Sequence, residues 1–399
     1  MTSSMQPPAK LLDAFRTTFG GEPEFISRAP GRADLIGAHV DYNDGLVLPA
    51  AVTRNVWIAV RARPDKVVSI QSLDMKEHIR FELGNLNAKK TVEGAALPLW
   101  AQYPAGVAWA LTEAAFQIPG CDMAITGDIP AGAGLSSSAA VEVGYGLAWA
   151  TLMGMEIDRM RLALICQRAE NAYVGVNSGI MDQFSSACGQ KDRALLLDCR
   201  SLEWESVPLS QDVALVVADT ATRRNLATSK YNERRAECEQ ALASLKTALP
   251  DIKALRDVSP KQFREYRDLI PMPARMRAQH VIEEIDRVEQ AAEALKQGNV
   301  GTLGELMDAS QISSRDLYDA SGPELDAMWE ASMGHSARLG GRFLGGGWAG
   351  CMIFLVDASG ADDFTSVTGK SYQEATRLEP QFYVVGAAQG AEIIRQGDF

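Results

Sequence analysis

The chain has 399 residues, of which 46% are hydrophobic and 23% are charged. This balance is typical of a folded globular protein and excludes intrinsic disorder as the main state. At about 150 residues per domain, the length predicts two to three domains. The formal net charge of −12 disfavours nucleic acids and anionic membranes as partners, although a local basic patch could still bind a small anion.

Cysteine and histidine spacing argues against two further classes of protein. The six cysteines and four histidines are scattered, without a CxxC or HExxH pair, so we expect neither a disulfide framework nor a histidine-rich metal centre. Residues 1–10 lack the basic and apolar parts of a signal peptide. Prolines interrupt the longest uncharged stretch, residues 94–112. We therefore expect a cytoplasmic protein without a transmembrane helix.

Strand-like and helix-like stretches alternate along the chain. Apolar, β-branched runs predict strands, and longer runs with helical spacing or many charged, alanine and leucine residues predict helices. The expected strands are residues 56–61, 67–71, 213–219 and 351–356, and the expected helices are residues 136–153, 159–174, 230–249 and 275–296. The pattern predicts an α+β class with two lobes, residues 1–205 and 206–399, which meet near residues 200–212.

The most informative motif is a glycine- and serine-rich segment, PAGAGLSSSAA, at residues 130–140. Gly132 and Gly134 permit positive φ angles and a close approach of the backbone to a ligand. The following serines and alanines begin a helix, whose free N–H groups and dipole suit an anion. The segment is not a Walker A loop because it lacks lysine, and it is not GxGxxG because Ser137 replaces the third glycine. Taken alone, it could equally be a flexible connection or a tight helix–sheet contact.

Three further segments concentrate polar residues or glycines between apolar runs. Residues 31–51 hold short donors and acceptors of the kind that bind sugar hydroxyls, although a polar turn would have the same composition. Asp182 lies between the apolar residues Met181 and Phe184, where an unpaired carboxylate would be costly. Residues 344–351 place three successive glycines before a strand, which indicates a close backbone approach or a tight turn. The polar residues of the first segment are Arg32, Asp34, His39, Asp41, Asn43 and Asp44.

Together, these segments resemble the GHMP kinase superfamily and, within it, the galactokinases. Residues 31–51 resemble the galactokinase signature, residues 130–140 the phosphate loop of the superfamily, and residues 344–351 its third, glycine-rich motif. Weaker agreement follows at residues 100–107, 229–239 and 313–326. The resemblance implies the two-lobed GHMP kinase fold, with an N-terminal lobe like that of a small-subunit ribosomal protein and a C-terminal ferredoxin-like lobe.

The resemblance also implies an activity: an ATP-dependent sugar 1-kinase that converts D-galactose to galactose 1-phosphate. Asp182 matches the catalytic aspartate, which accepts or holds the proton of the anomeric hydroxyl. Arg32 beside it would keep this carboxylate ionised and offset charge on the transferring phosphoryl group. Ser138 and Glu170 match the magnesium-linked positions, a short ligand set that suits Mg²⁺ because phosphate oxygens and water complete its shell.

Two further groups of residues follow from the same resemblance. The sugar hydroxyls would be contacted from His39, Asp41, Gly179, Tyr231 and the position of Ala38. ATP would be bound by Trp100, near the adenine, and by the phosphate-loop residues Gly132, Gly134, Leu135, Ser136, Ser137 and Ser138. Core packing stays an alternative for Trp100.

The sequence departs from the galactokinase pattern beside the signature histidine. Galactokinases usually carry a glutamate there that contacts the sugar's O6, and here the residue is Ala38; losing a hydrogen bond to a charged group weakens such a contact about 10- to 150-fold. Asp34 stands where the family usually has asparagine, and its charge would oppose an acidic sugar if it faced C6. The third motif also departs, at Leu344, Trp348 and Ala349.

These departures keep other functions open. Plant-type galacturonate kinases share the GAH sequence at Ala38, so D-galacturonate is the specific rival substrate. A non-catalytic regulator that senses ATP and sugar is disfavoured because the phosphate loop, Arg32 and Asp182 are all present. A GHMP kinase for mevalonate or homoserine is disfavoured by the sugar-binding segment at residues 39–45.

Overall fold

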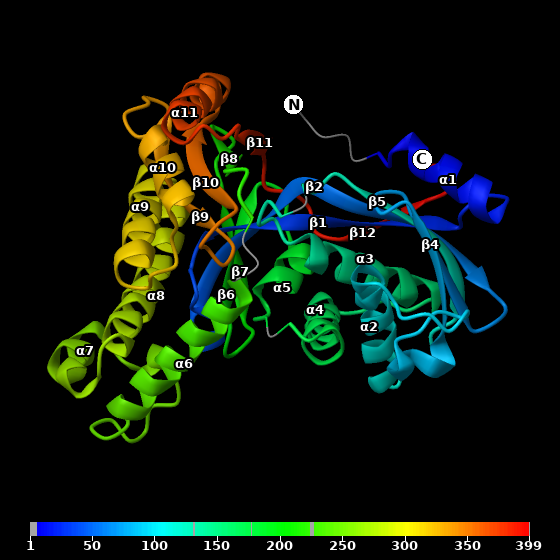
Figure 1. The fold of residues 1–399 in the computed structure, drawn as a ribbon, viewed down its shortest axis with the longest axis horizontal. Helices are drawn as coiled ribbons and strands as arrows, with labels where there is room; N and C mark the ends of the chain where they lie inside the picture. The colour runs from blue at the N-terminus through cyan, green and yellow to red at the C-terminus, as the bar shows by residue number, and fades with distance from the viewer. Residues whose placement is uncertain (1–5, 131, 177, 224–226, 399) are drawn as a thin grey trace.

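Two β-sheets define two lobes that lie side by side in the computed structural model (Figure 1). The structure describes residues 6–130, 132–176, 178–223 and 227–398, so Ala131 of the phosphate loop lies outside the described residues. Among the helices of this described part, none combines the length and apolar character needed to cross a bilayer.

The first lobe is built on an eight-stranded sheet with the path β12-β1-β2-β5-β3-β4, and β6 pairs with both β2 and β7. Its neighbouring strands are antiparallel except for the parallel pair β3–β5. The strands are β1 (Phe25–Ile36), β2 (Leu46–Arg63), β3 (Val67–Ser72), β4 (Glu77–Glu82), β5 (Gly120–Gly127), β6 (Arg193–Asp198), β7 (Trp204–Pro208) and β12 (Glu392–Arg395).

Helices cover both faces of this sheet, because apolar side chains on its strands point to both faces. Trp57 and Ala59 of β2 pack with α1 on one face, whereas Ile58 and Val60 join the main core on the other, because successive strand residues point to opposite faces. Figure 1 shows α1 alone above the sheet and the other helices of the lobe below it. The helices are α1 (Ala9–Phe19), α2 (Leu99–Glu113), α3 (Ser137–Leu152), α4 (Arg159–Arg168) and α5 (Met181–Cys188).

The second lobe has a four-stranded antiparallel sheet in the order β11-β8-β10-β9. Long helices stand beside it, on the left of the view in Figure 1. The strands are β8 (Val213–Asp219), β9 (Arg338–Leu344), β10 (Cys351–Asp357) and β11 (Gln381–Val385). The helices are α6 (Ala227–Leu245), α7 (Pro260–Tyr266), α8 (Ala274–Lys296), α9 (Val300–Asp316), α10 (Pro323–Ser332) and α11 (Ala361–Thr376).

The expected elements are all present, with one difference that matters for the site. The helix expected at residues 159–174 is α-helical only to Arg168, and a π-helical turn, Ala169–Val174, follows it. The N–H groups of Gly175 and Val176 both donate to the carbonyl of Glu170. Such π-turns occur often at functional sites, and this one carries a predicted magnesium ligand.

The division at residue 205 stays a prediction, although most sheet membership follows it. β7 crosses the proposed boundary, and β12 returns from the second half of the chain to pair with β1. The first sheet therefore contains strands from both halves of the sequence.

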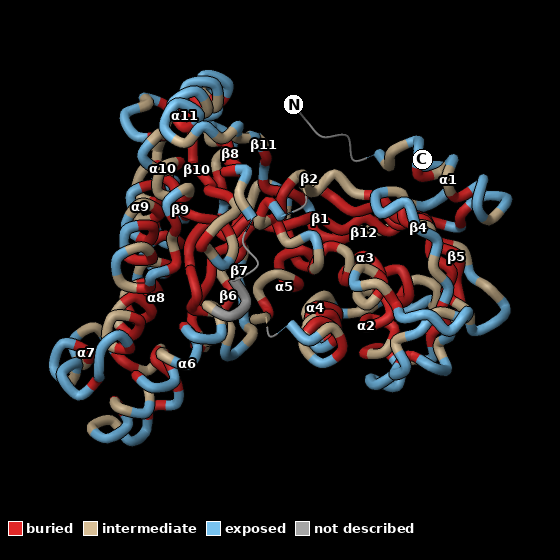
Figure 2. The backbone as a smooth tube through the Cα atoms, in the orientation of Figure 1, coloured by how far each residue is buried: buried red, intermediate tan, exposed pale blue. Residues whose placement is uncertain are grey.

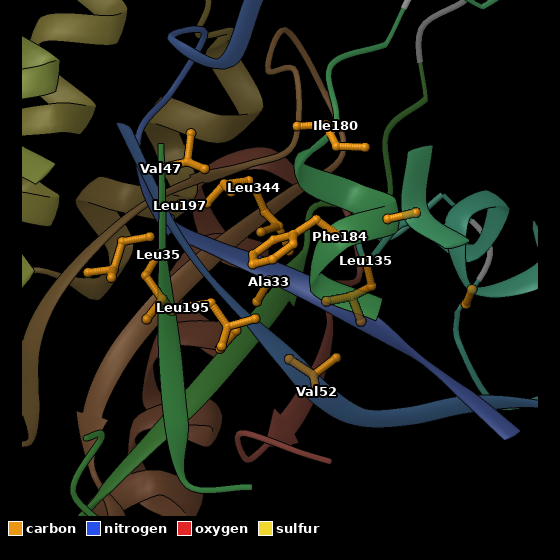
Figure 3. Packing of buried hydrophobic residues seen from close by; sticks show 14 of the residues in the cluster. Ala33, Leu35, Val47, Val52, Leu135, Ile180, Phe184, Leu195, Leu197 and Leu344 are labelled. Carbon is orange, nitrogen blue, oxygen red and sulfur yellow. The ribbon is translucent and has the colours of Figure 1, made fainter. Parts of the chain in front are cut away.

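Buried apolar side chains run continuously from one lobe to the other. The buried parts of the tube in Figure 2 extend through both sheets and the helices against them. Figure 3 shows Leu135, Ile180, Phe184 and Leu344 close together, beside β1 residue Ala33. Each of the first four lies in or next to a predicted site motif, so this packing fixes the positions of the motifs relative to one another.

Candidate active site

The predicted sugar-binding and catalytic residues line one cavity of about 290 Å³. Its walls come from β1 and the loop after it, from the start of α5, from α6, and from the glycine-rich segment before β10. The predicted residues in this wall are Arg32, His39, Asp41, Gly179, Asp182 and Tyr231. Ala38 is not part of it: this residue is buried, and its amide N–H donates to Glu284 Oε1 at 3.0 Å.

Arg32 and Asp182 form a bidentate ion pair at the centre of the site. Arg32 Nε lies 2.7 Å from Asp182 Oδ1, and Nη2 lies 2.8 Å from Oδ2. Arg32 Nη1 also donates to the carbonyl of Gly134 at 2.6 Å, so one guanidinium joins the carboxylate to the phosphate loop. The hydroxyl of Ser136 donates to Asp182 as well. Both oxygens of Asp182 are therefore held in fixed positions, as catalytic positioning requires.

Backbone contacts attach the phosphate loop to β1. The N–H of Arg32 donates to the carbonyl of Leu135 at 3.0 Å. A Cβ on the preceding residue, Gly31, would lie 2.6 Å from that same carbonyl oxygen, so only glycine permits this approach. The contact places Arg32 directly beside the loop.

The phosphate loop surrounds a second cavity of about 280 Å³. Gly132 and Gly134 have φ angles of 72° and 68°, and Ser136 has φ 51° although it is not glycine. Arg32 also lines this cavity, as do the glycines 345–346. The sugar and phosphate cavities therefore share a wall, and a phosphoryl group in one would lie next to a hydroxyl group in the other. The predicted loop residues in its lining are Gly132, Gly134, Leu135, Ser136, Ser137 and Ser138.

Trp100 lines a third cavity, of about 330 Å³, whose wall also contains Ser137 and Ser138. The indole Nε1 of Trp100 donates to Glu77 Oε2 at 2.6 Å, and its ring packs against the core. A mostly apolar cavity next to a phosphate loop suits a planar base. The core-packing alternative and the predicted adenine contact are thus compatible at this residue.

His39 is a neutral, fixed part of the sugar cavity. Burial lowers its pKa to about 3, and its neighbour His280 contributes in the same direction. Its Nε2 lies 3.0 Å from the carbonyl of Gly346 and its Nδ1 lies 2.9 Å from the hydroxyl of Tyr42. Because a carbonyl can only accept, Nε2 carries the proton and Nδ1 accepts from Tyr42. A contact between His39 and a sugar hydroxyl stays a prediction.

Asp41 and Gly179 meet in the wall of the same cavity. A Cβ at residue 179 would lie 1.8 Å from Asp41 Oδ2, so the absence of a side chain there makes room for the carboxylate. Burial, together with the charge of Asp182, raises the pKa of Asp41 to about 6. Asp41 is therefore mostly an acceptor at neutral pH and becomes protonated in mild acid.

The donor set of Ser138 and Glu170 fits Mg²⁺. Glu170 is buried, and burial raises its pKa, while hydrogen bonds from Ser178, Gln183 and Ser138 oppose that shift. A hydroxyl and a carboxylate are oxygen ligands of the kind that Mg²⁺ takes together with phosphate oxygens. In the described part of the chain, no group of three or more His, Cys, Asp and Glu side chains could hold a metal.

Sequence reasoning missed a buried carboxylate behind this pair. Gln183 Nε2 donates to Glu170 Oε2 at 2.8 Å and to Glu142 Oε2 at 2.9 Å. Glu142 is fully buried, and burial, followed by the charge of Glu170, raises its pKa well above the usual value. The signal was present in the sequence, because Glu142 is the one acidic residue within α3. Two further wall residues, Asp34 and Trp348, were noted as departures from the family and not as site residues.

Comparison with known proteins agrees with this geometry. Residues 102–190 match the model of the GHMP kinases N terminal domain, and residues 13–62 match the galactokinase galactose-binding signature. A galactokinase of Roseiflexus sp. is 40% identical over 97% of this chain and 97% of its own length. One of Clostridium perfringens is 40% identical over 95% of this chain and 98% of its own.

Solved structures give the same result for the fold. The crystal structure of Lactococcus lactis galactokinase complexed with galactose has a TM-score of 0.90 and 35% identity, covering 96% of this chain and 99% of that one. Methanococcus jannaschii mevalonate kinase, at 14% identity, covers 93% of this chain and 100% of its own with a TM-score of 0.64, which shows the shared fold alone. The chain has the GHMP kinase fold and is a kinase-type phosphotransferase that belongs to the galactokinase family.

Proposed function

We propose that the protein transfers the γ-phosphoryl group of ATP to the anomeric hydroxyl of D-galactose and so produces galactose 1-phosphate. The observation that carries the proposal is Arg32, which holds Asp182 in the sugar cavity and the Gly134 carbonyl in the phosphate loop. A single cation thus lies where donor and acceptor must meet. The galactose complex of the Lactococcus lactis relative supports the choice of sugar.

In this mechanism, Asp182 accepts or orients the proton of the anomeric hydroxyl. Arg32 offsets the negative charge of the phosphoryl group during transfer. The backbone N–H groups at the start of α3 hold the phosphates, because helix N-termini attract anions. Few reactive side chains are needed, since phosphoryl transfer depends mainly on positioning and charge neutralisation.

Ser138 and Glu170 are the proposed ligands of Mg²⁺. When bound there, the ion would neutralise negative charge on the phosphate groups of ATP. Gln183, which donates to Glu170 Oε2, holds the ligand carboxylate in place.

The charges of the sugar cavity favour a neutral sugar over D-galacturonate. Among the described residues, its wall contains the carboxylates of Asp34, Asp41 and Asp182 and the single guanidinium of Arg32, which Asp182 already engages. Ala38 is the single observation in favour of the acidic sugar. Like charges repel most strongly where water is excluded, so we place galacturonate second.

The test is coupled ADP release with ATP and magnesium, run in parallel on D-galactose, D-galacturonate, N-acetylgalactosamine and D-glucose. We expect the highest kcat/KM for galactose, and phosphate at C1 of the product by NMR. Asp182→Asn is the inactive control, and Asp192→Asn, which changes a carboxylate outside the three cavities, is the matched active one. A higher kcat/KM for galacturonate would reverse the assignment, and sugar binding without ADP release would identify a regulator.

A further inference from the structure

One corner of the sugar cavity contains a buried ion pair between the two lobes. Asp34 of β1 lines the cavity, and Arg342 of β9 lies behind it with Nη1 2.7 Å from Asp34 Oδ2. The same Nη1 donates to the backbone carbonyl of Asp34 at 3.3 Å. The side chains are 2% and 0% exposed, so water does not screen this pair.

The described part of the chain leaves three polar atoms of this pair without a hydrogen bond. Asp34 Oδ1 and the Nε and Nη2 atoms of Arg342 are buried and have no hydrogen-bond partner among the described residues. Leaving such atoms unpaired is costly, so a native site supplies them with water or with a ligand. An acceptor beside donors suits a hydroxyl group, which can both give and accept a hydrogen bond. The charge of Asp34 would repel the carboxylate of an acidic sugar. A methyl group could form a hydrogen bond with neither Asp34 nor Arg342.

The polar groups behind the cavity wall, beside the buried Ala38, are already hydrogen-bonded to one another. Glu284 Oε1 accepts from the N–H groups of Gly37 and Ala38, at 3.0 Å each, and from the hydroxyl of Ser310 at 2.6 Å. Arg287 Nε lies 2.7 Å from Glu284 Oε2. Asp34 and Glu284 therefore each have their own guanidinium, so an additional glutamate at position 38 would be a buried charge without a guanidinium of its own.

We propose that Asp34, fixed by Arg342, is the residue that selects a neutral sugar in this protein, in the role that residue 38 fulfils in galactokinases with a glutamate there. This inference rests on the proposed function. Asp34 Oδ1 accepts a hydrogen bond from a sugar hydroxyl, and the Asp34 charge excludes a uronic acid. The presence of Asp34 is also what permits alanine at position 38.

The first test compares sugar preference in Asp34→Asn and wild-type protein. Asparagine keeps the shape but leaves the charge of Arg342 uncompensated, so we expect the ratio of kcat/KM for galacturonate to that for galactose to rise about 10-fold or more. Asp122→Asn is the matched control, because Asp122 is a buried aspartate paired with Arg61 and Arg63 outside the cavity. An unchanged ratio in folded Asp34→Asn protein overturns the proposal.

The second test does not depend on catalysis. We expect Ala38→Glu alone to lower the urea midpoint of unfolding, and Asp34→Asn with Ala38→Glu to recover it, since the double variant restores the charge balance. If Ala38→Glu is as stable as wild type, the proposal is overturned, even if Asp34→Asn cannot be purified. Calorimetric binding of both sugars to wild-type and double-variant protein gives the preference without turnover. Failure of the proposed function would appear separately, as wild-type protein that binds galactose but releases no ADP.

Discussion

Replacing Arg32 by lysine tests whether the bidentate geometry, and not the charge alone, supports phosphoryl transfer. Arg32 makes three hydrogen bonds, two to Asp182 at 2.7 and 2.8 Å and one to the Gly134 carbonyl at 2.6 Å. Lysine keeps the charge, but its single ammonium cannot reproduce the planar fork. One lost hydrogen bond to a charged group costs about 1.5–3 kcal/mol, which corresponds to a fall in kcat of about 10- to 150-fold.

The assay is coupled ADP release at saturating ATP and galactose, with folding checked by thermal unfolding. Arg28→Lys is the matched control, because Arg28 is a buried arginine of the same strand that pairs with Glu392, outside the cavity lining. It should lower stability and leave kcat unchanged. The importance of the bidentate geometry is refuted if folded Arg32→Lys protein keeps a kcat within about threefold of the wild-type value. It is also refuted if Arg28→Lys lowers kcat by the same factor as Arg32→Lys.

Three further predictions test Asp41 of the sugar cavity, the buried carboxylate of Glu284 and the cavity that Trp100 lines. Because the pKa of Asp41 is raised to about 6, the carboxylate loses its charge as pH falls through 6, so KM for galactose should rise between pH 7 and 5; a flat KM would contradict this. Glu284→Gln breaks a buried ion pair with Arg287 and should cost about 3–5 kcal/mol of unfolding free energy in urea, whereas Glu289→Gln, at an exposed position of α8, should change it little. Trp100→Ala should raise KM for ATP about 10-fold without changing KM for galactose, and Trp329→Ala, in the second lobe, should change neither; equal effects on both KM values would indicate lost packing instead.

Local sequence patterns predicted the elements well where one physical signal dominates. The apolar run at residues 351–356 is the buried centre of β10, and the small residues after Ser136 form α3. The helical segment predicted at residues 159–174 has these bounds, but its last part, Ala169–Val174, is π-helical, because a π-turn keeps the apolar spacing of a helix while changing its hydrogen bonds. Periodicity does not distinguish the two.

Sequence patterns located most of the predicted residues that line the sugar cavity, but they did not predict the contacts between these residues. Gly31 and Gly179 are needed because Leu135 and Asp41, far away in sequence, approach them closely. The ion pair between Asp34 and Arg342 depends on the packing of β1 against β9, which no local sequence pattern predicts. The ionisation of Asp41 likewise follows from burial and from its neighbours, which only the folded chain provides.

The pairing of β12 with β1 in the first sheet affects folding during synthesis as well as the stability of the folded protein. Residues Arg28 and Glu392 are 364 positions apart and form an ion pair across this pairing. Until residues 392–395 are synthesised, β1 is an uncovered sheet edge, which can pair with other chains, and contacts of such sequence separation form slowly. A nascent chain therefore carries an aggregation-prone edge until late in translation, and trimming residues 392–395 would disturb the strand that holds Arg32.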